Sequence, residues 1–293
     1  MLDPSRWRGY AMVVAAACCW GGMSILARLL LRDQSVGPLV LVAIRAYLAT
    51  VTVFAAAAAL RPACLRIERR HLWLTAVIGL TGFAANNFLY FEALHLTNVA
   101  TALLLQYQAP VLVALYSVLV QRQPLRGRII LALALALVGC SLVVRAYDPE
   151  MLRPNLLGVM AGLGTACTFA FYILASRAAL RSLDAWTLLA YGYFSASLFW
   201  SAVIPPWKIL GYGFSLGVWI TFLAIATVGT VLPFGLFIGG LKFLLPTQAG
   251  IVGMLEPVVA ATAAFVVLGE TLVPLQILGG GLVLAGVVMV QTT

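Results

Sequence analysis

Two charged residues fall inside long apolar segments of the sequence, where a charge is costly. Glu256 lies in the segment 246–268, and Arg45 lies in the segment 37–60. A charge at the centre of a membrane costs about 2.5–3.5 kcal/mol or more, so such residues are candidates for function. Glu256 could take up a proton or contact an amine, and Arg45 could bind a carboxylate. Alternatively, the two form a structural ion pair between helices, which is the favoured interpretation for Arg45.

Polar and aromatic side chains lie near mid-depth in other apolar segments. Amides are costly against lipid, so the face with Asn86, Asn87 and Tyr90 should turn inward. Gln106 and Gln108 are about 200° apart on a helix and cannot both line one cavity. Packing explains any single aromatic residue equally well. Together they predict an amphipathic binding pocket, whose candidate contacts are Trp20, Asn86, Asn87, Tyr90, Gln106, Tyr107, Gln108, Phe169, Tyr172, Tyr191, Phe237 and Glu256.

Three prolines inside apolar segments are candidate hinges. Pro110 and Pro257 lie near the middle of their segments, and Pro233 lies in the segment 214–240. Because proline removes a backbone hydrogen bond, it bends a helix. The alternative is that prolines are simply frequent in membrane helices. We expect bends at Pro110 and Pro257, and we favour a hinge role slightly.

Other chemistry is not indicated by the sequence. It has no His, Cys, Asp or Glu cluster with metal-ligand spacing and no phosphate-binding loop, so we expect no cofactor, no metal and no enzyme activity. The net charge of +9 could suggest nucleic acid. However, the basic residues lie at the ends of apolar runs, which is typical of membrane topology signals. Nucleic acid is therefore not an expected partner.

The composition places these residues in a membrane protein. The chain is 63% hydrophobic and 9% charged, against about 45–50% and about 25% in soluble domains. Segments that cross lipid without strand-like alternation must be helices, because their backbone groups need partners within the segment. The sequence predicts an all-α integral membrane protein with about ten spans, at 10–31, 37–60, 72–94, 98–120, 128–146, 155–178, 185–205, 214–240, 246–268 and 273–291.

The two halves of the chain resemble each other. A constant shift of 147 residues pairs Pro110 with Pro257 and Gly139 with Gly286. Each half then holds five spans, and because five is odd the second half enters the membrane inverted. We predict two five-helix repeats, residues 1–146 and 147–293, an architecture that exposes one central site to either side in turn.

The fifth and tenth spans look like peripheral packing helices. They carry almost no polar groups and have small residues one turn apart, which suit close helix contacts. These pairs are Ala132 with Ala136 and Gly281 with Ala285.

Loop charges predict the orientation. With a cytoplasmic N-terminus, 12 of the 18 Lys and Arg residues face the cytoplasm and 5 face outward, with Arg45 inside a span. Positive charge is retained on the cytoplasmic side. We therefore expect both termini in the cytoplasm and the protein in the cell inner membrane.

Several motifs resemble the drug/metabolite transporter superfamily, specifically its ten-helix members with two EamA-type repeats. The first half departs from the pattern, because Gln123-Pro124 replaces a usual glutamate and Ala109-Pro110 lacks an acidic residue. The motifs that carry the resemblance are Trp20-Gly21, Arg45, Leu255-Glu256-Pro257 through Leu268-Gly269-Glu270, Gln276, Gly279 and Gly286.

The resemblance implies a secondary transporter, and among members it is nearest to bacterial exporters of aromatic and other neutral amino acids. A pocket with amides, rings and little net charge suits neutral or zwitterionic metabolites, so amino acids are the expected substrates, exported by alternating access. The alternatives are an exporter of other metabolites or drugs, and a passive channel or scramblase. We expect a monomer or weak homodimer in the lipid bilayer.

Overall fold

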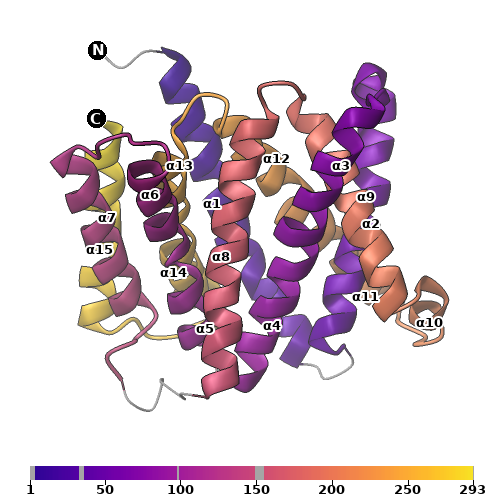
Figure 1. Cartoon of the computed structure of the whole chain (residues 1–293). Helices are drawn as coiled ribbons and strands as arrows, with labels where there is room; N and C mark the ends of the chain where they lie inside the picture. The colour runs from indigo at the N-terminus through magenta and orange to yellow at the C-terminus, as the bar shows by residue number, and fades with distance from the viewer. Residues whose placement is uncertain (1–3, 33–35, 98, 149–154, 293) are drawn as a thin grey trace.

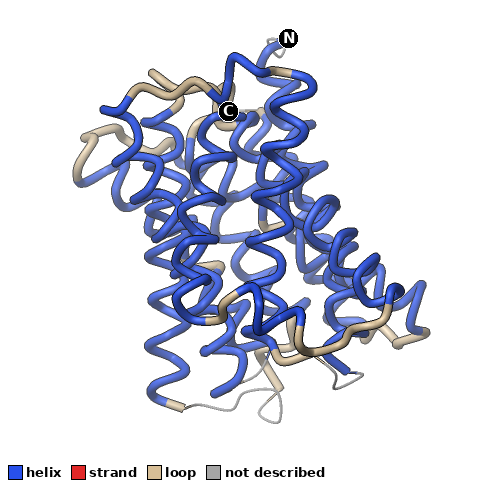
Figure 2. Tube along the Cα trace, turned by 90° about the vertical axis from the view of Figure 1, so that its right-hand side faces the viewer, coloured by secondary structure: helices blue, strands red, loops and turns tan. Residues whose placement is uncertain are grey.

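The computed structural model describes residues 4–32, 36–97, 99–148 and 155–292. All regular secondary structure in these ranges is helical, which confirms the all-α prediction (Figure 2). The first half contains α1 (Pro4–Arg32), α2 (Pro38–Leu60), η1 (Pro62–Leu65), α3 (Arg69–Ile78), η2 (Gly79–Ala85), α4 (Asn86–Leu96), α5 (Val99–Gln106), α6 (Ala109–Leu119) and α7 (Gly127–Val143).

The second half has the corresponding elements. They are α8 (Leu156–Ala179), α9 (Ala185–Val203), α10 (Pro206–Leu210), α11 (Leu216–Ala226), η4 (Thr227–Val231), α12 (Leu232–Gly240), α13 (Pro246–Gly253), α14 (Glu256–Leu268) and α15 (Pro274–Gln291). Eight helical passages are long and apolar enough to span a bilayer, and α7 is a shorter apolar helix. With α9, the described ranges contain ten passages, as predicted.

The halves pack through matching contacts. Helix α1 packs against α12 and α14, and its counterpart α8 packs against α4 and the α5–α6 pair. Helix α2 packs against its own counterpart α9, as α7 does against α15. The α7–α15 pair and the α2–α9 pair lie at opposite edges of the bundle (Figure 1). Each contact therefore recurs with the halves exchanged, as two inverted repeats require.

The seam between α7 and α15 is a backbone contact. A Cβ atom on Gly139 would lie 2.6 Å from the Gly279 carbonyl oxygen, and one on Gly279 would lie 2.6 Å from the Gly139 carbonyl oxygen. Ala132 and Ala136 are buried here, as expected. The prediction for Gly281 and Ala285 is wrong.

The small residues that α15 uses lie on another face. Gly281 and Ala285 are exposed, and a Cβ on Gly281 would meet nothing within 4 Å. Gly279, Val283 and Gly286 are buried instead. Helix α15 carries small residues on more than one face, so spacing alone did not select the face that meets α7.

The passages around the centre are interrupted at matching positions. The π-helical segments η2 and η4 coincide under the shift of 147 residues. The passage α5–α6 breaks at residues 107–108, and α13–α14 breaks at residues 254–255. Pro110 and Pro257 are the second residues of the helices that resume after these breaks. The helix is interrupted there because neither proline has the backbone amide that would continue the hydrogen-bond ladder. The expected interruption is present at both prolines, and their hinge role stays a prediction.

Candidate functional site at the centre of the bundle

The π segment η4 positions Arg45. In a π helix the bonds join residues five apart, which frees carbonyls from the usual ladder. Thr230 Oγ1 donates to the Ile225 carbonyl oxygen at 2.8 Å. Arg45 Nε donates to Thr230 Oγ1 at 3.1 Å, which ties α2 of the first half to the second half. Arg45 is surrounded by protein yet keeps partial exposure.

The two asparagines directly follow the matching segment η2, as the first residues of α4. Asn87 Nδ2 donates to the Phe83 carbonyl oxygen within the π segment. Asn86 Nδ2 donates to the Thr165 carbonyl oxygen at 3.0 Å and to Thr168 Oγ1 at 3.1 Å, both on α8. Asn86 is therefore engaged in helix packing, whereas Asn87 lies beside Arg45 in the small cavity described next.

A small cavity adjoins Arg45, with room for about one water molecule. Tyr193 and Trp200 are 3% and 0% exposed, and the Tyr193 hydroxyl and the Trp200 indole nitrogen have no hydrogen-bond partner among the residues that the structure describes. Buried polar groups without partners call for a water, an ion or a ligand. The lining residues are Val42, Arg45, Ala46, Phe83, Asn87, Tyr193, Ala196, Trp200 and Thr230.

Glu256 begins α14, directly after the break at residues 254–255. A carboxylate is favourable at a helix N-terminus. Tyr107, from the equivalent break in the first half, interacts electrostatically with Glu256, and its buried hydroxyl has no partner at standard hydrogen-bonding geometry. Glu256 and Arg45 also interact electrostatically, although the described ion pairs do not join them. Like Arg45, Glu256 keeps partial exposure.

Four of the candidate aromatic residues form one cluster. Trp20 of α1 lies 5.6 Å from Phe237 of α12, measured between ring centroids. Phe169 and Tyr172 of α8 stack at 5.8 Å, and Tyr172 stacks on Phe237 at 6.2 Å. Tyr172 and Phe237 are fully buried. The cluster therefore packs α1 of the first half against α8 and α12 of the second half in this conformation.

The other candidates are dispersed. The Tyr191 hydroxyl donates to the Leu65 carbonyl oxygen at 2.7 Å, near one end of the bundle. Gln108 Nε2 donates to the Leu104 carbonyl oxygen of its own passage at 3.1 Å, and Gln106 ends α5. Two remaining candidates lie near Arg45 or η4. Tyr90 interacts electrostatically with Arg45, and Pro233 is the second residue of α12, which follows η4.

Sequence analysis identified Arg45 and Asn87 but missed the three other lining residues of the small cavity that carry hydrogen-bonding side chains, Thr230, Tyr193 and Trp200. In the sequence, Thr230 resembles any other threonine in a membrane helix. Its hydroxyl donates to the Ile225 carbonyl oxygen, five residues earlier, within the π segment η4. Tyr193 and Trp200 share a face of α9 with Ala196, at spacings of three and four residues. That face could have been singled out from the sequence, because two buried groups with hydrogen-bond donors share it.

Ten helical passages in the described ranges, arranged as two inverted halves with opposite charges in the interior, are typical of membrane transporters. The sequence profile of the EamA-like transporter family matches residues 7–145 and 156–292. The chain belongs to this family, which is part of the drug/metabolite transporter superfamily. It is a multi-pass membrane transporter of small molecules, and not an enzyme.

Known proteins extend this likeness. An uncharacterized transporter of Archaeoglobus fulgidus is 33% identical over 72% of this chain and 75% of its own. The threonine/homoserine exporter RhtA of Escherichia coli K12 is 28% identical over 94% of this chain and 88% of its own. A solved crystal structure superposes with a TM-score of 0.79 at 19% identity, covering 96% of this chain and 95% of the other, which shows the shared fold.

Proposed function

We propose that this transporter exports small zwitterionic amino acids across the inner membrane by alternating access. The observation that carries the proposal is the pair of interior charges on opposite halves, Arg45 on α2 and Glu256 on α14. An α-amino acid carries a carboxylate and an ammonium group. Each of its charges therefore has a complementary partner between the two halves.

Arg45 is the proposed carboxylate contact. Its guanidinium remains charged and presents several donors, which suits a carboxylate. Tyr193 and Trp200 add donors that have no partner in this conformation. Glu256 is the proposed ammonium contact, with Tyr107 beside it. Hydrogen bonds that involve a charged group are about twice as strong as neutral ones, which offsets the loss of water from both ends of the substrate.

The closed state of this site supports alternating access as the proposed mechanism. The cavity at Arg45 has room for about one water molecule, so an amino acid needs the halves to separate. The interruptions at η2, η4 and the two mid-passage breaks are places where a helix can bend at low cost. Pro110, Pro257 and Pro233 lie at three of them and are the proposed hinges.

The likeness to RhtA, whose name specifies threonine and homoserine, supports an amino acid as the substrate class. The buried cluster around Phe237 favours the aromatic amino acids if its rings separate during transport. Exchange in proteoliposomes with labelled threonine, homoserine, phenylalanine, a sugar and a nucleoside distinguishes these. We expect saturable uptake of amino acids that the same solute inside accelerates. Flux that does not saturate would support a channel, and flipping of lipids would support a scramblase. Uptake of other solutes alone would support an exporter of another substrate class.

Two charge-removing variants test the proposed contacts. Arg45→Gln should abolish the preference for an amino acid over its amide, and Glu256→Gln should abolish the preference over the matching 2-hydroxy acid. Losing one charged contact of about 1.5–3 kcal/mol raises the apparent KM about 10- to 100-fold. Arg69→Gln, on the exposed first residue of α3, is the matched control. Unchanged discrimination in both variants would assign the two charges to structure alone.

A further inference from the structure

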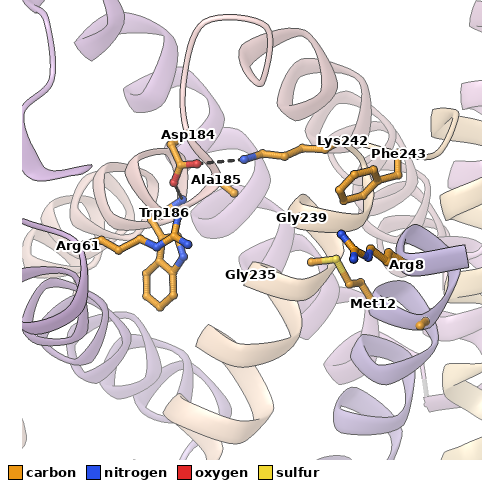
Figure 3. Close-up of a pocket in the computed structure, with 11 residues that line it drawn as sticks. Arg8, Met12, Arg61, Asp184, Ala185, Trp186, Gly235, Gly239, Lys242 and Phe243 are labelled. Carbon is orange, nitrogen blue, oxygen red and sulfur yellow. Dashed lines mark hydrogen bonds and ion pairs between the residues drawn. The ribbon is translucent and has the colours of Figure 1, made fainter. Parts of the chain in front are cut away.

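A second and larger cavity opens at the end of the bundle where α1 begins (Figure 3). Its volume is about 510 Å³, within the range of small-molecule sites. It lies between the start of α1, the end of α2, the start of α9 and the end of α12, and so joins both halves. The lining residues are Arg8, Ala11, Met12, Arg61, Asp184, Ala185, Trp186, Gly235, Gly239, Lys242 and Phe243.

The recess exists because α12 presents glycine to it. A Cβ on Gly239 would lie 2.2 Å from Met12 Cε, so this position is closed by α1. A Cβ on Gly235 would meet only Leu189 Cδ2, at 3.4 Å, which is an ordinary contact. Met12, Trp186 and Phe243 provide apolar walls. A larger side chain at position 235 would therefore occupy the cavity without displacing the backbone.

The charges around the cavity do not balance. Three cations and one anion line it. Lys242 Nζ donates to Asp184 Oδ1 at 3.0 Å, so these two charges offset each other (Figure 3). Arg8 and Arg61 are exposed, come from opposite sides of the cavity, and form no ion pair described in this structure. Two positive charges are left for a ligand.

We propose that this cavity binds the phosphate headgroup of an anionic phospholipid, with the start of an acyl chain against Trp186 and Phe243. The lining charges lie at helix ends, where a membrane helix meets the headgroup layer, and tryptophan is favoured at that depth. Basic pockets between transmembrane helices are known headgroup sites. A zwitterionic amino acid, with no net charge, would offset none of the excess positive charge, whereas a lipid phosphodiester offsets one unit of it.

Lipid-dependent stability tests this proposal. Phosphatidylglycerol, added to the purified protein in neutral detergent, should raise the melting temperature, and native mass spectrometry should show a retained adduct. Phosphatidylcholine should do neither. Arg8→Gln with Arg61→Gln should weaken the apparent lipid affinity at least about tenfold, since two charged contacts are lost. Gly235→Leu should reduce it by filling the recess, with every charge in place.

The matched control is Arg66→Gln with Arg69→Gln, which removes two exposed charges outside the cavity, one just before α3 and one at its first residue. This control should bind phosphatidylglycerol as the wild type does. If the control weakened the apparent lipid affinity equally, the loss in the Arg8 and Arg61 variant would be an effect of general surface charge. Protection by inorganic phosphate at matching concentration would assign the cavity to a free phosphate compound. Displacement of the lipid by threonine or phenylalanine would make it a substrate vestibule. Each of these three results overturns the proposal.

Discussion

At the scale of single residues, Asp184 joins segments that are distant in sequence. Its carboxylate accepts from Lys242 Nζ and from the Trp186 amide, both at 3.0 Å, and from Cys64 Sγ at 3.5 Å. Burial raises the pKa of Asp184, but the hydrogen bonds from Lys242 and the Trp186 amide outweigh burial and hold this pKa below its ordinary value. The ionised form therefore stabilises the fold.

Two substitutions separate the charge of Asp184 from its role as helix cap. Asp184→Asn keeps a capping oxygen and loses the ion pair, which is about one-third exposed and contributes less than about 1 kcal/mol. Asp184→Ala also removes the cap, at about 1 kcal/mol more. The two steps should appear as successive decreases in melting temperature at pH 7.

The stabilisation by Asp184 should depend on pH. A depressed pKa gives stability that is fully present above the ordinary value of 3.8 and is lost as the pH falls through the lower native value. The difference between wild type and Asp184→Asn should therefore shrink below about pH 4. A difference that stayed constant as the pH falls below 3.8 would contradict this. Glu68→Gln, in the exposed pair with Arg70, should change little at any pH.

The central site was partly predictable at this scale. Arg45 and Glu256 are identifiable from sequence because a charged side chain inside a membrane span is costly on any face of the helix. Hydrogen-bond partners are different, because they depend on helix packing. Asn86 and Asn87 are adjacent and equally polar, yet Asn86 bonds to α8 and Asn87 bonds to the preceding π segment η2. No spacing rule separates these two roles.

At the scale of elements, the helix boundaries were predictable and the interruptions only in part. Proline marks the breaks before Pro110 and Pro257 because it lacks an amide. The π segments have no such mark. Gly82 and Gly229 lie in them at matching positions, but the chain has 26 glycines and most lie in regular helix or loops. The same abundance of small residues led to the wrong face of α15.

The seam itself is testable. Gly139→Leu or Gly279→Leu should force α7 and α15 apart, because a Cβ at either position lies 2.6 Å from a carbonyl oxygen. Overpacking of this kind costs about 1–3 kcal/mol. Gly281→Leu, on the exposed face of the same helix, is the control and should leave the melting temperature unchanged. A greater decrease in melting temperature for Gly281→Leu than for Gly279→Leu would place the contact with α7 on the other face of α15.

At the scale of the whole molecule, the inverted repeat was predictable from the shift of 147 residues and the odd number of spans. The contacts between the halves were not, since periodicity indicates which face of a helix is apolar but not which helix covers it. In a membrane nearly every face is apolar, which removes even that guide. The small size of the cavity at Arg45 could not be predicted from the sequence either, because it depends on how the two halves pack together.

Orientation in the membrane is a whole-molecule prediction that the helix bundle does not decide. The start of α1 and the end of α15 lie at the same end of the bundle (Figure 1). The loop charges predict that this end faces the cytoplasm. A fluorescent protein fused after residue 293 should therefore fluoresce, and alkaline phosphatase fused there should be inactive. The reverse pattern would invert the topology and turn the phospholipid cavity to the outer leaflet.

The glycine seam between α7 and α15 has a mechanical consequence. It lies at the edge opposite the α2–α9 contact (Figure 1), and direct backbone contact leaves few side chains that could slide. In the proposed alternating access, α7 and α15 therefore stay together, and the α2–α9 contact at the opposite edge moves farthest. Lateral pressure from the surrounding lipid would resist that movement. Under the proposed mechanism, we therefore expect membrane tension and thickness to influence turnover, independent of any molecule that the protein binds.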